Sequence, residues 1–302
     1  MIDAVQILWS PAGVTLSALD PLELVDVTDG DTPNLRMPVR MLSVDTPEVT
    51  ARTDQRAKAI DQEFAQLADW ISQGRAPISQ PLAEFMVPKL ATGRAGRLQL
   101  QQGREASAFA KQRFQERLTK PDGSKRRLFV RMADSPFDDN GRLLAYVAPN
   151  YTEKERRAMT RAERATFNLE LVEAGHAAPF VIYPSIPGEL DLPLLLEAAS
   201  AAVSEPRGIW ANAETLLAYE YRAMEKLFRV TRKIVNNQPL KPGEARSWRE
   251  RYCVDMRTRS LHGPEDYLGI APEYRLWIWP ADLNEAIGRL NLLPSPRLVG
   301  AS

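Results

Sequence analysis

The first fifty residues alternate between short hydrophobic runs and turn residues, which predicts β-strands. The runs are rich in Val, Ile and Leu, and clusters of Pro, Gly, Asp and Asn separate them: residues 5–9, 14–19, 22–27 and 39–44. From about residue 53 to 72 the apolar positions recur at steps of three and four instead, which predicts an amphipathic helix. The chain is therefore expected to open with strands and to continue into a helix.

The middle of the chain combines an irregular stretch with further helices and a hairpin. Residues 74–103 carry Gly and Pro without a clear period, which predicts a long loop. A second helix is expected from Gly103, and residues 126–149 have the pattern of a β-hairpin that turns at an Asn-Gly pair. Two Thr-x-x-Glu capping boxes after the hairpin predict two consecutive helices that end near Gly175.

The last third of the chain has a different character. Residues 191–204 are apolar on nearly all sides, as expected of a buried helix. Beyond them, apolar residues at alternating steps of four and three predict a helix with a coiled-coil-like seam that packs on 191–204: Leu217, Tyr221, Met224, Phe228, Thr231 and Val235. A basic helix is expected over 243–257 and an aromatic strand over 273–279.

Composition narrows the classes of protein. The 302 residues are 44% hydrophobic and 26% charged with zero net charge, which is typical of a folded globular protein and excludes wholesale disorder. One cysteine excludes an intramolecular disulfide framework and a cysteine-rich zinc site, and two widely spaced histidines argue against a histidine metal centre. No apolar run reaches the ~18 residues of a membrane span and no signal peptide is recognisable, so we expect a cytoplasmic protein without membrane partners.

Two short acidic motifs follow predicted strands and form the candidate site: DGDT at 29–32 and DTPE at 45–48. Two strand ends of a small barrel can bring these carboxylates together, and oxygen ligands without His or Cys suit a hard cation such as Ca²⁺. Each motif alone is also an ordinary turn sequence, and their spacing does not show that they meet. Strict alternation places Arg40 and Asp45 on opposite faces of a strand, so their convergence requires a bend between them.

The acidic motifs belong to a longer pattern, VTDGDTPNLRMPVRMLSVDTPE, which resembles the active-site signature of the staphylococcal nuclease (thermonuclease) family. Further stretches resemble that family's motifs in the same order: REASAF at 104–109, DNGRLLAY at 139–146, NLELVEAG at 168–175 and IW at 209–210. Five motifs in the right order, covering about residues 20–212, are far more specific than any one of them.

The resemblance implies an α+β fold built on a five-stranded OB-type β-barrel with flanking helices. On that basis the chain divides into a nuclease-like domain at 1–213, with an insertion at 49–103, and a mainly helical C-terminal extension at 214–302. The implied function is Ca²⁺-dependent hydrolysis of phosphodiester bonds in DNA or RNA, leaving 3′-phosphate ends. The extension is absent from minimal family members and is a candidate surface for a protein partner or for self-association.

The resemblance assigns the acidic residues to a metal site and a general base. Asp31 and Asp45 would bind Ca²⁺ through their carboxylates, and Thr46 would bind it through its backbone carbonyl. Glu48 would hold the attacking water and accept its proton.

Two arginines complete the implied catalytic set. Arg40 and Arg142 would stabilise the negative charge that develops on the phosphate oxygens, a task suited to a planar and always charged guanidinium. Without the resemblance, Arg142 would be interpreted as a solvated arginine of a hairpin.

The expected nucleic-acid contacts depart from the family's pattern. An Asp-Asn pair at 139–140 stands where relatives often have a Lys-Tyr pair that contacts a phosphate, and Tyr183 is the one counterpart of two tyrosines near the base pocket. Tyr183 could stack on a base, or it could be a packed tyrosine. Lys89, Arg94 and Arg97 in the insertion are candidates to replace the lost phosphate contacts, and the alternative is a structural insertion with solvated charges.

Three functions are compatible with the sequence. The first is a metal-dependent endonuclease, the second is a non-catalytic module of the same fold that binds nucleic acid or protein, and the third is an effector subunit of a larger defence or DNA-processing system. The presence of Asp31, Arg40, Asp45, Glu48 and Arg142 favours the enzyme, because non-catalytic relatives have lost the acids.

Overall fold

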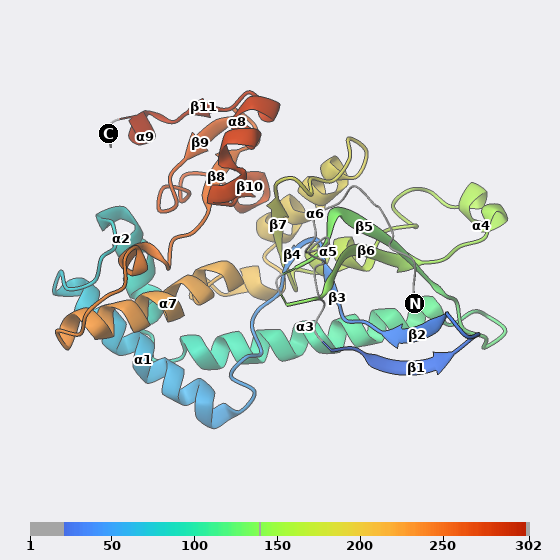
Figure 1. Cartoon of the computed structure of the whole chain (residues 1–302), viewed down its shortest axis with the longest axis horizontal. Helices are drawn as coiled ribbons and strands as arrows, with labels where there is room; N and C mark the ends of the chain where they lie inside the picture. Colours follow the sequence, from blue (N-terminus) through green and yellow to red (C-terminus); the bar gives the residue numbers. More distant parts are fainter. Residues whose placement is uncertain (1–20, 139, 300–302) are drawn as a thin grey trace, which may run out of the picture.

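The computed structural model describes residues 21–138 and 140–299, which form a mixed α+β fold (Figure 1). A three-stranded sheet has the order β3-β6-β5, with β3 at Val39–Met41, β5 at Leu128–Phe137 and β6 at Leu143–Pro149. β5 and β6 are antiparallel neighbours, which confirms the predicted hairpin. A separate hairpin consists of β1 (Glu23–Val27) and β2 (Pro33–Arg36). The strands predicted at 5–9 and 14–19, and Asp139, lie outside the described residues.

A six-stranded sheet unites the N-terminal and C-terminal parts of the chain, in the order β11-β9-β8-β10-β7-β4. β4 (Ser43–Asp45) pairs antiparallel with β7 (Ala178–Ile182), and β7 pairs in parallel with β10 (Arg275–Ile278). The other strands also come from the C-terminal segment: β8 (Tyr252–Asp255), β9 (Ser260–His262) and β11 (Leu293–Pro294). The aromatic strand predicted over 273–279 is therefore confirmed as β10, and it extends a sheet that β4 and β7 begin.

One face of this sheet is covered by a layer of helices: α1 (Asp54–Ser72), α2 (Gln80–Leu90), α3 (Ala95–Leu118) and α7 (Ala218–Val235). α1 begins as predicted after Thr53, whose hydroxyl accepts the backbone N–H of Arg56. The apolar stripe of α1 is buried, with Phe64 and Leu67 fully inaccessible. These helices and the sheet residues Ala178 and Phe180 belong to one hydrophobic core.

The opposite face of the sheet packs in a second core beneath shorter helices: α5 (Phe167–Glu173), α6 (Leu192–Ser204) and α8 (Leu283–Leu290). Val44 of β4 and Val181 of β7 point into this core, whereas Phe180 points into the first one, as the alternation of a strand requires. The short helices α4 (Glu153–Ala158) and α9 (Pro296–Val299) complete the α-helices of the described residues. Four 3₁₀ turns accompany them, at Gly208–Ala211, Glu244–Arg246, Pro272–Tyr274 and Pro280–Asp282.

Residues 74–103 do not form the predicted long loop. They form α2 and the beginning of α3, which starts at Ala95 rather than at Gly103. Pro81 lies in the first turn of α2, where its missing N–H breaks no helical hydrogen bond. Gly93, with a φ of 67°, turns the chain between the two helices. Several of the Gly and Pro residues that suggested a loop therefore mark helix ends, although Pro88 lies inside α2.

The seam of α7 is confirmed, but it packs in a different place than expected. Tyr221 and Phe228 are buried among α1 side chains, where Tyr221 makes an edge contact with Phe64 and Phe228 stacks on Trp70. The apolar helix α6 contributes instead to the core on the other face of the sheet. The prediction that the seam packs on 191–204 is wrong, because the six-stranded sheet lies between α6 and α7.

The basic helix predicted over 243–257 is also wrong. This stretch contains a 3₁₀ turn and the strand β8, whose residues Cys253 and Val254 are buried on opposite faces of the sheet. Residues on both sides of the proposed boundary at 213/214 share the six-stranded sheet and both cores. The C-terminal segment is thus joined to the rest of the fold by strands as well as by helices.

The two capping boxes have different outcomes. Thr152 and Glu155 form a complete capping box at the start of α4, as predicted. Thr160 and Glu163 make the same reciprocal contacts, at 2.6 and 3.2 Å, but they close a turn rather than a helix. The following helix α5 has its own cap at Thr166.

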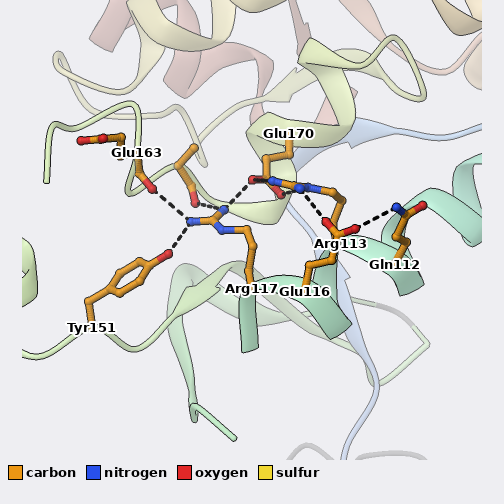
Figure 2. Close-up of polar contacts among 8 residues, drawn as sticks. Gln112, Arg113, Glu116, Arg117, Tyr151, Glu163 and Glu170 are labelled. Atoms are coloured by element: carbon orange, nitrogen blue, oxygen red, sulfur yellow. Dashed lines mark hydrogen bonds and ion pairs between the residues drawn. The ribbon is translucent and has the colours of Figure 1, made fainter. Parts of the chain in front are cut away.

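An ion-pair network fastens α3 to α5 (Figure 2). Arg117 and Arg113 both donate to Glu170 Oε1, at 2.7 and 2.9 Å, and Arg117 also donates to the Tyr151 hydroxyl at 2.9 Å. The side chains of Arg117 and Glu170 are only 10% and 11% exposed. The network therefore fixes α5, which carries Asn168, to the long helix α3.

The sheets of the described residues do not close into a barrel, so the predicted five-stranded OB barrel is not seen in this part of the chain. The hairpin β1–β2 is exposed along its whole length (Figure 1). None of the described helices combines the length and apolar composition needed to cross a membrane.

Candidate active site

A bend between β3 and β4 brings Arg40 and Asp45 together. Ser43 has a φ of 59°, in the left-handed region that residues other than glycine rarely adopt. The bend interrupts the alternation that would separate the two side chains, and Arg40 Nη2 lies 3.9 Å from Asp45 Oδ1. The structure therefore contains the convergence on which the predicted site depends.

Hydrogen bonds from neighbouring elements hold this bend in place. Ser43 Oγ lies 2.6 Å from the hydroxyl of Tyr146 on β6. The carbonyl of Leu42 accepts a hydrogen bond from Asn168 Nδ2 at 2.8 Å, and Asn168 Oδ1 accepts the N–H of Val147 at 3.0 Å. Asn168 is buried, so these bonds are shielded from water. A strained backbone persists where its surroundings fix it in this way.

The long helix α3 positions Glu48. An added Cβ at Gly103 would lie 2.8 Å from the carbonyl oxygen of Pro47 and 3.2 Å from that of Glu48, so only glycine permits this approach. In the amide orientation that satisfies both its contacts, Gln99 accepts the N–H of Glu48 at 2.9 Å and donates to the carbonyl of Leu216 at 3.1 Å. The backbone of Glu48 thus rests directly on α3.

One guanidinium from α7 binds both carboxylates. Arg222 Nη1 and Nη2 lie 3.0 and 2.8 Å from the two oxygens of Asp45, and Nη1 lies 2.5 Å from Glu48 Oε1. The side chains of Asp45, Glu48 and Arg222 are 4%, 21% and 27% exposed. Bidentate contact of this kind is strong and geometrically specific.

Burial and pairing set the charge states of the arginines in this cluster. Burial alone would lower the pKa of Arg222, but Asp45 and Glu48 raise it above its ordinary value. Burial lowers the pKa of Arg40, Asp45 opposes that effect, and the positive charges of Arg142 and Arg222 add to it.

Another arginine of the C-terminal segment, Arg251, lies on the same face of the sheet. Its Cζ is 5.1, 5.8 and 5.1 Å from the ring centroids of Phe180, Trp277 and Trp279. Phe180 pairs with Ser43 across the β4–β7 ladder, two positions from Asp45. Burial, together with the charge of Arg222, lowers the pKa of Arg251 to about 10, so it is still protonated at neutral pH. Among the described residues its guanidinium has no hydrogen-bond acceptor.

Arg142 lies just before the strand that pairs with β3, which carries Arg40. It precedes β6, whose Leu144 pairs with Arg40, and its side chain is 35% exposed. Its Nε donates to Asp138 Oδ2 at 2.8 Å, and its backbone N–H donates to Oδ1 at 3.0 Å. Burial raises the pKa of Asp138, but the hydrogen bonds from Arg142 outweigh it and hold that pKa below its ordinary value. Arg142 is thus accessible to a phosphate but paired in this structure.

The residues implied for Ca²⁺ are not brought together. Asp31 lies in the exposed turn of the hairpin β1–β2, where it accepts a hydrogen bond from Thr32 Oγ1 at 3.1 Å, whereas Thr46 directly follows Asp45. Within residues 21–138 and 140–299, no group of three or more His, Cys, Asp or Glu side chains could hold a metal ion. Because both oxygens of Asp45 bind Arg222, the described arrangement does not fit a calcium site.

The part of the chain that carries Arg40, Asp45, Glu48 and Arg142 matches a known family. Residues 38–212, more than half of the chain, match the family described as Staphylococcal nuclease homologue. The chain belongs to this family. The match confirms the resemblance in the sequence, and no curated protein matches the chain. Members of the staphylococcal nuclease family are generally nucleases and typically depend on Ca²⁺.

The four residues expected to contact nucleic acid all make contacts within the protein. Lys89 donates to the carbonyl of Thr215 at 2.8 Å, and Arg94 donates to Glu214 at 2.5 Å, so both bind the C-terminal segment. Their roles in nucleic-acid binding stay predictions, and each would have to exchange a partner for a phosphate.

Arg97 and Tyr183 contact buried parts of the fold. Arg97 Nε donates at 2.5 Å to Asp61, a buried carboxylate that also accepts the N–H of Gly96 at the start of α3. Tyr183 is buried in the second core, which is the packed alternative for this residue. Stacking of a base on Tyr183 would require that core to open.

Arg222 is the residue of the cluster that the family's pattern does not include. It lies outside the matched range 38–212, and 177 positions separate it from Asp45. The signal in the sequence is weak, since Arg222 follows the seam residue Tyr221 and sits at the edge of the apolar face of α7. Nothing local indicates which acidic residues it binds.

Proposed function

We propose that the protein is a nuclease that hydrolyses phosphodiester bonds of DNA or RNA at the cluster of Arg40, Asp45, Glu48 and Arg142. The observation that supports the proposal most strongly is the bend at Ser43, which sets Arg40 beside Asp45 inside the stretch that matches the staphylococcal nuclease family. Strained backbone that its surroundings hold in place is often found at functional sites.

In this proposal Glu48 is the general base. Its carboxylate is partly exposed and reachable by water, whereas Asp45 is buried. Arg222 binds Glu48 Oε1, so the other carboxylate oxygen, Oε2, is the one that accepts the proton of the attacking water. The water oxygen bonds to phosphorus as its proton passes to Glu48, and the bond from phosphorus to the 5′ oxygen breaks. The leaving 5′ oxygen takes up a proton from solvent, so the products carry a 3′-phosphate and a 5′-hydroxyl.

Arg40 and Arg142 are the proposed ligands of the scissile phosphate. Arg40 lies on β3, Arg142 directly precedes the neighbouring strand β6, and each side chain is 35% exposed. Two guanidinium groups can bind the non-bridging oxygens and stabilise the charge that builds up on them. Arg142 would exchange its bond to Asp138 for the phosphate.

A dependence on Ca²⁺ is a separate part of the proposal. The family typically depends on Ca²⁺, but the arrangement described here does not fit a calcium site, so none of the steps above uses the ion. Parallel cleavage assays with Ca²⁺, with Mg²⁺ and with a chelator test the dependence directly.

We also propose that the hairpin β1–β2 packs on β5 and completes the barrel of the family. Both surfaces expose apolar side chains, including Val27 at 56% on the hairpin and Met132 at 60% on β5. A cavity of about 460 Å³, lined in part by Phe129, Met132 and Tyr146, lies next to β5. Closure would carry Asp31 along with the hairpin.

Arg251 and Trp279 support a nucleic-acid strand as the substrate. Trp279 is 37% exposed and stacks against Arg251, which has no acceptor among the described residues. Single strands bind through aromatic stacking of bases and arginine contacts to phosphates, and this pair offers both on the sheet face that carries Asp45.

The second candidate function is a module that binds nucleic acid without cleaving it. It is favoured by the contacts of Arg222, which occupy both carboxylates of the site. Binding of oligonucleotides without cleavage under every cation tested would support this alternative.

The test of the nuclease proposal compares two arginine substitutions. Arg142→Lys keeps the charge but loses the bidentate fork, so we expect its cleavage rate to fall by about 10²-fold. Arg131→Lys is the matched control, because Arg131 is an exposed arginine of β5 in the same sheet. Labelled DNA and RNA oligonucleotides report rate, substrate preference and product ends. Equal rates for the wild type and a folded Arg142→Lys variant would remove Arg142 from the reaction.

A further inference from the structure

The contacts of Arg222 use the oxygens that a cation would need. The guanidinium binds both oxygens of Asp45 and one oxygen of Glu48, at 2.8, 3.0 and 2.5 Å. A calcium ion binds carboxylate oxygens at about 2.3–2.6 Å, a position that the N–H groups of Arg222 block. A divalent cation therefore cannot coordinate Asp45 until Arg222 leaves it.

The four ion-paired groups around Asp45 already balance one another in charge. Asp45 and Glu48 carry two negative charges, and Arg40 and Arg222 supply two positive charges within 3.9 Å of them. A buried carboxylate without a partner is costly, so this balance stabilises the arrangement. Adding a divalent cation while Arg222 stays in place would leave a large excess of positive charge.

The helix α7 is buried in the core, whereas the side chain of Arg222 is partly exposed. Its neighbours Tyr219 and Tyr221 are 3% and 1% exposed, and Met224 is fully buried, so α7 is part of the core and not a detachable lid. The side chain of Arg222 is 27% exposed and has several rotatable bonds. Exchange with a cation thus requires rotation of one side chain and no movement of the helix.

We propose that Arg222 is an internal cation of the site, which binds Asp45 and Glu48 in mutual exclusion with a divalent cation. The C-terminal segment thereby sets how strongly the nuclease-like part binds metal. Arg222 is a positioning residue in this proposal, because it acts on the carboxylates and touches no substrate. The proposal goes beyond the nuclease function, and its test needs no nucleic acid.

The test measures Ca²⁺ binding by calorimetry on the whole protein. Arg222→Gln removes the competing charge, so we expect it to bind Ca²⁺ at least about tenfold more tightly than the wild type, as for any ligand freed from an internal competitor. Arg229→Gln is the matched control, since Arg229 is an exposed arginine of the same helix, and it should bind as the wild type does. Addition of Asp45→Asn to Arg222→Gln should abolish the gained affinity.

Thermal stability gives a second readout. Without Ca²⁺ the Arg222→Gln variant leaves Asp45 poorly paired and should melt below the wild type, and Ca²⁺ should raise its Tm more than that of the wild type. If Arg222→Gln does not fold, Arg222→Lys keeps the charge without the fork and should show a smaller gain in affinity. Equal Ca²⁺ affinity of the wild type and the Arg222 variants, or no Ca²⁺ binding by any of these proteins, would overturn the proposal.

Discussion

Replacing Gly103 by alanine tests how the helix α3 positions Glu48. A Cβ at this position would lie 2.7 Å from Val49 Cγ1 and 2.8 Å from the carbonyl oxygen of Pro47. Since one of these atoms belongs to the backbone, the loop that carries Glu48 has to move away from the helix. Gly288 of α8 is the matched control, because no heavy atom lies within 4 Å of the Cβ that alanine would add there.

The two substitutions should have opposite effects on stability. Alanine in place of glycine inside a helix stabilises by about 0.5–1 kcal/mol, which is the full expected effect at Gly288. At Gly103 the same gain is opposed by overpacking, which costs about 1–3 kcal/mol. Because the contact at Gly103 is with the backbone, we expect a net loss of roughly 1–2 kcal/mol and a Tm lower by roughly 2–5 °C.

Activity should respond at Gly103 alone. A misplacement of about 1 Å at a reacting group can cost about 10²-fold in rate, so displacement of Glu48 by a few tenths of an ångström should slow cleavage severalfold. Thermal melts and cleavage rates of Gly103→Ala and Gly288→Ala measure both effects. A Gly103→Ala variant that gains stability as Gly288→Ala does, and cleaves at the wild-type rate, would refute the positioning of Glu48 by α3.

Two further substitutions test ion pairs of the framework. Arg142 holds the pKa of Asp138 below its ordinary 3.8, so their ion pair stabilises the fold above about pH 4 and is lost as the pH falls. The wild type should therefore melt above Asp138→Asn at neutral pH, and this difference in Tm should shrink in acid. A pH-independent difference in Tm would contradict this. Glu170→Ala leaves Arg117 buried without its carboxylate and should cost about 3 kcal/mol in denaturant melts, whereas Glu116→Ala, an exposed pair, should cost little. Equal losses for the two would show that burial of the network is unimportant.

The sequence indicated candidate site residues but not how they are arranged. The DTPE motif and the Gly-Arg of the hairpin pointed to Asp45, Glu48 and Arg142 as candidates, because they are short local patterns. The bend at Ser43 was required but not predictable, since serine has no intrinsic preference for a φ of 59°. It is imposed by Tyr146 and Asn168, which are distant in the sequence.

The helix α2 and the start of α3 were missed for a local reason. Residues 74–103 contain Gly and Pro at positions that end or begin helices. The helical period of apolar residues is hard to recognise when such residues interrupt it. The burial of Leu82, Met86 and Leu90 is created by α1 and α7, which lie on either side of α2 in the sequence. Tertiary packing decided the structure here.

The contribution of the C-terminal segment depends on long-range contacts. The period of α7 indicated its seam, but not that the sheet separates it from α6. The contact of Arg222 with Asp45 spans 177 positions and follows from the way in which α7 packs on the face of β4 and β7. An arginine at the edge of a helix is an ordinary surface residue until that packing is known.

The most direct test of the proposed nuclease is a single-turnover cleavage assay of the wild type and Glu48→Gln. With protein in excess over a labelled oligonucleotide, the wild type should cleave, and Glu48→Gln should bind as well but cleave about 10²–10⁴-fold more slowly, because it keeps the shape of the side chain and loses the base. Arg131→Lys serves as the control for handling and folding. Cleavage by folded Glu48→Gln at the wild-type rate, or binding without cleavage by the wild type under every cation condition, would contradict the assignment of this cluster as a nuclease active site.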